Sequence, residues 1–167
     1  SRSSFEMFHL VASMGTIFFG FLIYILVVNS TISTRNTLLL TIGTVYLFVG
    51  FLDFAHAISF DGLNYIFNTA NESAQVWVAS RLLEATGFLI ALTLCINSER
   101  CFSRFVQILF ASIAIGSIAS ISYLDLPLFI DANGPTIYMI VAESFIIFMF
   151  LISVIRLFMI DGHLTGF

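Results

Sequence analysis

The sequence contains no lysine and few charged residues of either sign. Only 10% of its 167 residues are charged, and the formal net charge is −4. A soluble globular domain carries about 25% charged residues because its surface faces water, so this chain lacks the charge to cover such a surface. No nucleic acid is expected as a partner, because nucleic-acid binding requires a basic face.

The sequence also lacks a recognisable cysteine pattern and a recognisable catalytic motif. The two cysteines, Cys95 and Cys101, are six residues apart, a spacing typical of neither a metal site nor a disulfide framework. The sequence has no His-Glu-x-x-His motif and no serine that is obviously paired with a histidine. We therefore assign the cysteines no chemistry and expect no enzyme activity in this chain.

Long apolar runs dominate what the sequence does contain. Hydrophobic residues make up 59% of it, and the mean hydropathy is +1.05. Runs of about 20 residues cross a bilayer as helices, and continuous rather than alternating apolar runs argue against a β-barrel. We predict an all-α fold, a polytopic transmembrane helical bundle that forms one membrane-embedded domain over residues 1–167. Five spans are expected, at about residues 5–28, 38–60, 74–96, 105–124 and 135–160.

The ends of the chain and of its last span give two further expectations. Pro135 opens the fifth run, and proline is well suited to the first turn of a helix. Residue 1 is not methionine, so we expect the sequence to be a piece of a longer protein, trimmed at both ends.

The short connections between the runs predict the orientation in the membrane. Arginines lie in the first and third connections and near the end of the fifth run, at Arg35, Arg100, Arg104 and Arg156. The second and fourth connections contain acids and no arginine. Because positive charge marks the cytoplasmic side, we expect the N-terminus outside and the C-terminus in the cytoplasm.

Ionisable residues recur inside the predicted spans, three residues apart. Such residues are costly in a bilayer and usually face the bundle interior for a functional reason, and a spacing of three places both members of a pair on one helix face. The predicted topology puts all of them in the outer half of the membrane, where we expect them to converge on one polar site. The candidate sensing residues are Glu6 and His9, Asp53 and His56, Arg81 and Glu84, and the single acid Glu143.

Several of these residues also have a purely structural explanation. Glu6 could lie among lipid headgroups, and His56 could be an interfacial residue that ends its helix. Arg81 and Glu84 could form an ion pair that only neutralises its own burial. Asp53 is too deep for a routine surface acid and is the strongest candidate.

Two residues in the later spans remain open to more than one interpretation. Glu143 has no partner on its own helix and needs one on another span, for which Arg81 or a histidine would serve. Trp77 lies one turn before Arg81, and an anchor at the membrane interface is favoured over a stacking platform.

Two other patterns receive structural interpretations only. Ser112, Gly116 and Ser120 repeat every four residues, which predicts a small-residue seam for close helix contact, either inside the bundle or at a dimer face. The sequons at Asn29 and Asn71 are weak matches, and we assign neither a role.

Four segments together resemble a known family. They are Phe8-His9, the run from Tyr46 to His56, Trp77 with Arg81, Leu83 and Glu84, and the run from Pro135 to Glu143. In these segments the chain resembles the bacterial membrane-associated sensor domains, specifically the third class of the MASE series. The resemblance implies a sensory input module in the bacterial inner membrane, fused to a cytoplasmic histidine kinase or diguanylate cyclase.

The chain also departs from the pattern of that family. After the histidine of the second span the family continues with a basic residue and a glycine, where this chain has residues 59–62, Ser-Phe-Asp-Gly. The family also has further spans beyond the fifth. A site completed by those spans would be only partly present here.

The residues and the resemblance favour a sensor of two-component or cyclase signalling, with membrane lipids, its own output domain and a second copy as partners. The candidate stimuli are a metal ion, haem, a lipophilic molecule such as a quinone, and protons. We favour a metal ion or haem, because His9 and His56 with Asp53 form a nitrogen and oxygen ligand set. The alternative is a proton- or ion-coupled transporter, but the inner half lacks the polar residues to complete a pathway.

Overall fold

The structure, a computed structural model, describes residues 2–34, 36–59, 66–67, 69–94 and 104–164. Five helices and one short hairpin make up this part of the chain. The elements are α1 (Arg2–Thr34), α2 (Thr37–Ser59), α3 (Ala70–Leu94), α4 (Arg104–Tyr123), β1 (Ile130–Asp131), β2 (Gly134–Pro135) and α5 (Ile137–Leu164). Each helix is long and apolar enough to cross a membrane. The prediction of an all-α polytopic bundle is confirmed, and the chain is a multi-pass membrane protein.

Some sequence predictions fall on positions outside this description. Cys95, Cys101, Arg35 and Arg100 lie outside the described residues. For Glu6 and Arg104 the helix is described but not the side chain.

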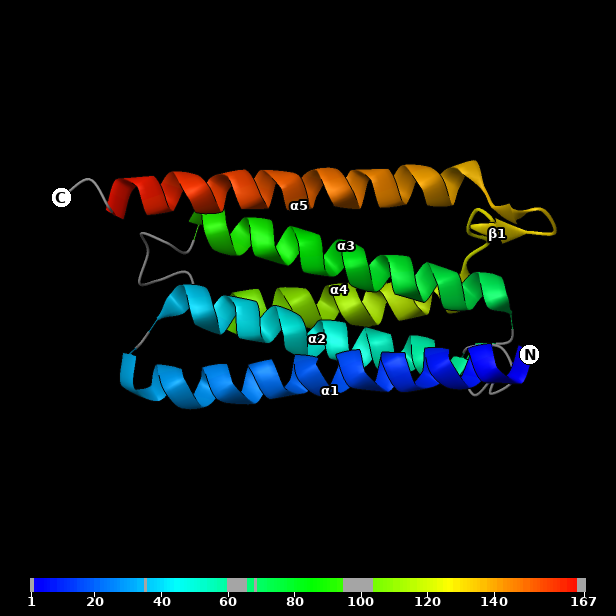
Figure 1. Cartoon of the computed structure of the whole chain (residues 1–167), viewed down its shortest axis with the longest axis horizontal. Coiled ribbons are helices and arrows are strands. Elements are labelled where there is room, and N and C mark those ends of the chain that lie inside the picture. The colour runs from blue at the N-terminus through cyan, green and yellow to red at the C-terminus, as the bar shows by residue number, and fades with distance from the viewer. Residues whose placement is uncertain (1, 35, 60–65, 68, 95–103, 165–167) are drawn as a thin grey trace.

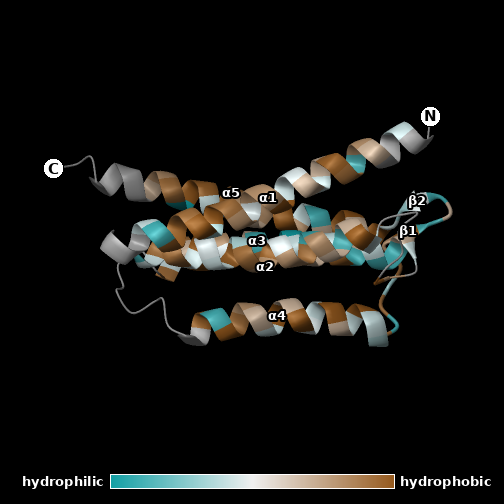
Figure 2. Cartoon of the chain, turned by 90° about the horizontal axis from the view of Figure 1, so that it is seen from below, coloured by the Kyte–Doolittle hydropathy of each residue, from teal (hydrophilic) through white to brown (hydrophobic). Residues whose placement is uncertain are grey.

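Two central helices organise the bundle. α2 and α3 pack against each other, α1 packs on α2, α5 packs on α3, and α4 contacts both α2 and α3. In Figure 2, α4 covers one face of the α2–α3 pair, and α1 and α5 lie on the other. Figure 1 shows α1 and α5 at opposite edges of the bundle. α1 and α5 therefore lie on the same face of the α2–α3 pair, at its two opposite edges.

Small and branched residues allow the close approach of α2 and α3. Val45, Leu52, Val76 and Leu83 lie in the main buried cluster, together with residues of α4. Gly87 faces Val45 so closely that an added Cβ would collide with the valine side chain. Glycine is thus required at this point of the α2–α3 interface.

The start of α3 corrects the predicted boundary near Ala74. The Thr69 hydroxyl accepts a hydrogen bond from the Glu72 backbone N–H (3.1 Å), and the Glu72 carboxylate accepts from the Thr69 N–H (3.0 Å) and hydroxyl (2.9 Å). This is a capping box, a Thr and a Glu three residues apart that satisfy each other's backbone donors. The polar residues interpreted as a connection therefore form the first turn of the helix, which begins at Ala70.

The connection between α4 and α5 forms a small hairpin that the sequence did not predict. Ile130 pairs with Pro135 in an antiparallel arrangement, and Gly134 has a φ of 113°, which glycine adopts without strain. Pro135 therefore lies in β2, and α5 begins at Ile137 rather than at Pro135. We call this end of the bundle, at the right of Figure 1, the hairpin end.

Two side chains of α3 hold the hairpin connection in place. The Asn71 Oδ1 accepts hydrogen bonds from the backbone N–H groups of Phe129 (2.6 Å) and Ile130 (3.2 Å). Gln75 donates to the Pro127 carbonyl at 2.9 Å. The Asn71 side chain thus has a structural role, and the hairpin is fixed to the start of α3.

The small-residue seam of α4 does not lie inside the described bundle. Ser112 and Gly116 are exposed, and an added Cβ at Gly116 would meet nothing within 4 Å. For the described residues, the prediction that this seam lies inside the bundle is therefore wrong. The alternative of a dimer face stays a prediction.

Candidate functional site

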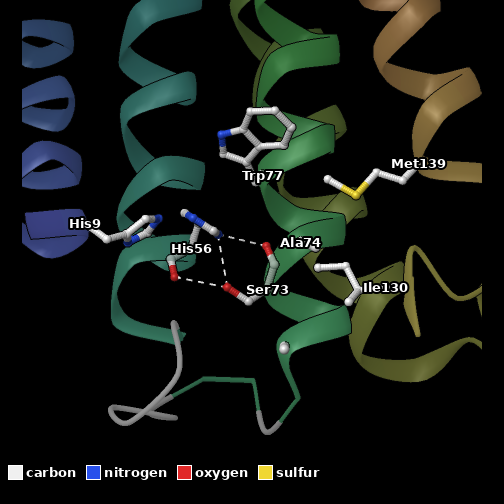
Figure 3. A pocket seen from close by; sticks show the side chains of 8 residues that line it. His9, His56, Ser73, Ala74, Trp77, Ile130 and Met139 are labelled. Atoms are coloured by element: carbon white, nitrogen blue, oxygen red, sulfur yellow. Dashed lines mark hydrogen bonds between the residues drawn. The ribbon is translucent and has the colours of Figure 1, made fainter. Parts of the chain in front are cut away.

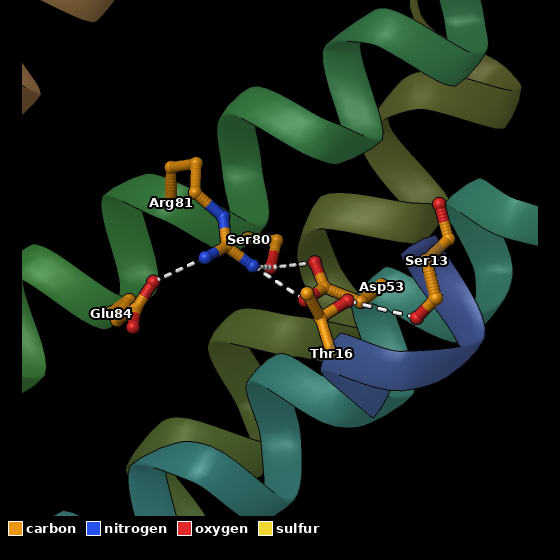
Figure 4. Close-up of polar contacts among 6 residues, drawn as sticks. All are labelled: Ser13, Thr16, Asp53, Ser80, Arg81 and Glu84. Carbon is orange, nitrogen blue, oxygen red and sulfur yellow. Dashed lines mark hydrogen bonds and ion pairs between the residues drawn. The ribbon is translucent and has the colours of Figure 1, made fainter. Parts of the chain in front are cut away.

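The Arg81 side chain of α3 joins two carboxylates that come from different helices. Its NH2 group donates to Asp53 Oδ2 of α2 at 2.5 Å, and its NH1 group donates to Glu84 Oε2 at 2.5 Å. Ser80 supports the pair, because its hydroxyl donates to Asp53 Oδ1 at 2.5 Å and accepts from Arg81 at 3.1 Å. Figure 4 shows this network, which predicted and unpredicted residues form together.

Burial makes the network energetically important. Asp53 is 6% exposed and Glu84 is 8% exposed, whereas the Arg81 side chain keeps 25% of its surface. A charge buried away from water is strongly destabilising unless it is paired and hydrogen-bonded. With both carboxylates ionised, the three groups carry one net negative charge, and the arginine is the part that remains accessible.

A second polar contact connects the hairpin ends of α1, α2 and α3. The His9 and His56 rings meet edge to face, with centroids 5.5 Å apart. The His56 Nδ1–H donates to the Ser73 carbonyl at 2.9 Å and lies 3.0 Å from the Ser73 hydroxyl. Because a carbonyl only accepts hydrogen bonds, this contact fixes the proton on Nδ1 and the orientation of the ring. Figure 3 shows the two histidines with Ser73 and Trp77 beside them.

Two adjoining cavities connect the histidines to the charged network. One, of about 400 Å³, opens at the hairpin end and takes lining residues from α1, α2, α3, β1 and α5. The other, of about 330 Å³, includes Asp53 and Arg81 in its lining. His9, His56 and Trp77 line both cavities. Of the predicted site residues, His9, Asp53, His56 and Arg81 line these cavities, which together form a groove bordered by α1 and reaching α5; we call it the polar groove.

The network lies deeper than the sequence predicted. Since α3 begins at Ala70 rather than near residue 74, Arg81 and Glu84 lie about 17 and 21 Å from its start, about 6 Å further than the predicted start would place them. This places them near the middle of the helix. The difference is one helical turn and follows from the unrecognised capping box.

Aromatic contacts continue from the network to the last helix. Tyr46 interacts electrostatically with Glu84, and its ring centroid lies 5.8 Å from that of Phe88. Phe88 in turn lies 6.3 Å from Phe150 of α5. A continuous set of side-chain contacts thus joins Asp53 to α5.

A comparison with protein families identifies the family of the chain. The sequence profile of MASE3, a membrane-associated sensor domain, matches residues 1–164. The chain belongs to the MASE3 family. No curated protein and no solved structure shows significant similarity to it. The resemblance to the third class of the MASE series is confirmed, and the family assignment makes the chain a membrane-associated sensor domain.

Glu143, a predicted site residue of this MASE3 domain, is not part of the network. Glu143 is partly exposed on α5, and no hydrogen bond or ion pair joins it to another described residue. Arg81, its expected partner, already bonds two other acids. The Glu6 side chain lies outside the described side chains, so its interpretation stays a prediction.

The described side chains offer no ready metal site. No group of three or more His, Cys, Asp or Glu among them lies in a metal-binding arrangement. Of the predicted set, His9 and His56 adjoin, but both Asp53 oxygens accept hydrogen bonds from α3. Among the described residues, His9, His56 and Asp53 therefore do not form a three-ligand metal group.

Sequence reasoning missed several residues of the site, some of which left a signal. Ser73, Ser80 and Gly87 share one face of α3 with the predicted Glu84, because the four residues follow one another at intervals of seven, four and three. This polar and small face is the one that packs on α2. Ile130 and Met139, by contrast, gave no signal, because only the hairpin brings them to the groove.

Trp77 takes a different position from the one favoured by the sequence. It is half-buried, lines both cavities and packs against the α3–α5 cluster. A residue interpreted as an interfacial anchor is thus a wall of the MASE3 polar groove.

Proposed function

We propose that this MASE3 domain senses a stimulus in the polar groove and passes it through α5 to a cytoplasmic output domain. A histidine kinase or a diguanylate cyclase is the expected output, and the expected location is the bacterial inner membrane. The observation that carries the proposal is the Asp53–Arg81–Glu84 network, which lies inside membrane-spanning helices with its arginine facing a cavity. Such residues in a membrane are usually retained for a function.

The contacts around the network supply a route for the signal. A ligand shifts a conformational equilibrium only through different affinities for two states. The polar groove borders α1, α2, α3 and α5 at the hairpin end, so an occupant can bind one packing of these helices better than another. The contacts from Tyr46 through Phe88 to Phe150 connect the network to α5.

The proposal also includes the orientation of the helices in the membrane. Arg156 lies in the part of α5 far from the hairpin end, and the sequence places Arg35, Arg100 and Arg104 at the same end. By the positive-inside rule the hairpin end faces outside and α5 leads into the cytoplasm. A homodimer is proposed for the whole protein, since kinase and cyclase outputs commonly work as dimers.

The test measures the activity of the output domain in membrane vesicles that contain the whole protein. Allosteric coupling of 1–3 kcal/mol corresponds to about 5–150-fold, so Arg81→Gln is expected to change the output at least about fivefold. Phe148→Ala, on the exposed side of α5, is the matched control and should leave the output within about twofold. A folded Arg81→Gln protein with wild-type output would contradict the proposal.

A further inference from the structure

The polar groove has one apolar end and one charged end. Near the hairpin its lining includes Ala70, Ala74, Ile130 and Met139, and deeper in it includes Ser13, Thr16, Asp53 and Arg81. The two cavities, of about 400 and 330 Å³, fall within the range of sites for small molecules. An occupant would therefore be amphipathic, with its polar group beside Arg81.

The unused hydrogen-bonding groups at the charged end are donors. A guanidinium has five N–H donors, and the bonds to Glu84, Asp53 and Ser80 use three of those of Arg81. Of the two that remain, the Nε–H is buried and has no partner among the described residues, so the second NH1 hydrogen is the donor left for an occupant. Both Asp53 oxygens, in contrast, already accept hydrogen bonds. The polar group of the occupant is thus expected to be an acceptor oxygen.

Charge decides between an anionic and a neutral acceptor. Two carboxylates already lie 2.5 Å from the Arg81 guanidinium. A ligand carboxylate or phosphate would bring a third negative charge next to them, in a site where charges are poorly screened. A neutral carbonyl oxygen can accept from Arg81 without that repulsion.

The apolar end fits a flat ring with a hydrocarbon tail. Trp77 lines both cavities, the first of which Figure 3 shows, and an indole packs well against another ring. Met139 and Ile130 supply apolar contacts on the side of α5 and β1. The cavity at the hairpin end is open rather than enclosed, so a tail can extend from it into lipid.

We propose that the polar groove binds a lipid-soluble quinone in its oxidised form, with a carbonyl on Arg81 and the ring against Trp77. This rests on the proposed function, because the quinone is the stimulus that the groove detects. A reduced quinol must also donate two hydroxyl hydrogens, but the Asp53 carboxylate is only 6% exposed and is held by Ser80 and Arg81, so it presents little surface to a hydroxyl. The quinol is therefore expected to bind about tenfold more weakly, the equivalent of one hydrogen bond.

The chain provides its own reporter for a binding experiment. Trp77 is its single tryptophan, so fluorescence reports on the groove directly. The 167-residue chain in quinone-free nanodiscs would be titrated with a benzoquinone and a naphthoquinone that carry ten-carbon tails. Their reduced forms would be added as competitors. Saturable quenching at one site per chain is expected, with quinol competing about tenfold less well.

Two variants separate binding in the groove from simple partition into lipid. Ala12 lines the deeper cavity and is exposed, so Ala12→Phe fills the groove without touching the charged network and should weaken binding at least tenfold. Ile115 is exposed on α4, outside the groove, so Ile115→Phe should bind like wild type.

The outcomes distinguish this inference from the proposed function. Quenching that rises linearly in all three proteins, or equal binding of quinone and quinol, would overturn the quinone assignment. If Arg81→Gln still changes the output in that case, the sensor proposal stands and only the ligand class is wrong. If neither the quinone nor Arg81→Gln has an effect, both proposals fail.

Discussion

Arg81 and Asp53 face each other across the α2–α3 interface, with a guanidinium nitrogen 2.5 Å from a carboxylate oxygen. Removing one member of a buried ion pair strands the other and costs about 3–5 kcal/mol. We expect Asp53→Leu to lower the free energy of unfolding by about 3 kcal/mol, measured by denaturation in detergent. Asp125→Asn, at an exposed acid in the α4–α5 connection, should change it by less than about 0.5 kcal/mol.

Gly87 and Val45 give a second test at the same interface. A Cβ at Gly87 would collide with Val45, and overpacking of this kind costs about 1–3 kcal/mol. Gly87→Ala should therefore lower the melting temperature, and adding Val45→Ala should restore part of the loss. Gly116→Ala, where an added Cβ meets nothing within 4 Å, should not be destabilising. Equal losses from both glycine substitutions would refute the packing described here.

Asn71 should control the order of the hairpin. Its Oδ1 accepts two backbone hydrogen bonds from Phe129 and Ile130, and leaving such donors without a partner costs about 1–3 kcal/mol. Asn71→Ala is expected to increase the rate of proteolysis within residues 125–134. Asn71→Asp keeps an acceptor at this position and should remain protected. If both variants are cut at the same rate, the side chain does not hold the hairpin.

The absorption spectrum and metal content of the purified protein test the earlier preference for a metal ion or haem. Because no three described His, Cys, Asp or Glu side chains form a metal-binding group, we expect metal far below one equivalent per chain. The His9 and His56 rings contact each other directly, with centroids 5.5 Å apart, which leaves no space for a porphyrin between them, so we expect no Soret band. The variant with His9→Ala and His56→Ala should look the same. A Soret band or stoichiometric metal that this variant loses would make the histidines a cofactor site.

Much of the fold could be predicted because it follows from apolar runs and bilayer thickness. The five spans were found, since each is longer than about 18 apolar residues. The start of α3 was misplaced because Thr69 and Glu72 are polar, although polar residues are typical of a capping box. The hairpin was missed because strands of two residues leave no periodic pattern.

The candidate site was predictable in part for a related reason. Spacing along one helix identified Asp53 with His56 and Arg81 with Glu84. It could not identify which helix faces would meet, so Ser80 and Tyr46 were not expected, and the partner of Glu143 was left open between Arg81 and a histidine. Contacts between helices depend on packing, and a single sequence specifies packing only through weak signals such as the small residue at Gly87.

The most direct test of the central claim replaces the charged network with neutral side chains of similar size. The variant combines Asp53→Leu, Arg81→Met and Glu84→Gln, because replacing a whole buried ion network often leaves stability unchanged or raises it. Output activity of the whole protein would be recorded in vesicles under oxidising and reducing conditions, at several pH values, and with and without metal. We predict a folded protein whose output no longer changes under any condition that alters the wild type. A folded variant that still responds like the wild type would contradict the claim that this network is the sensing element.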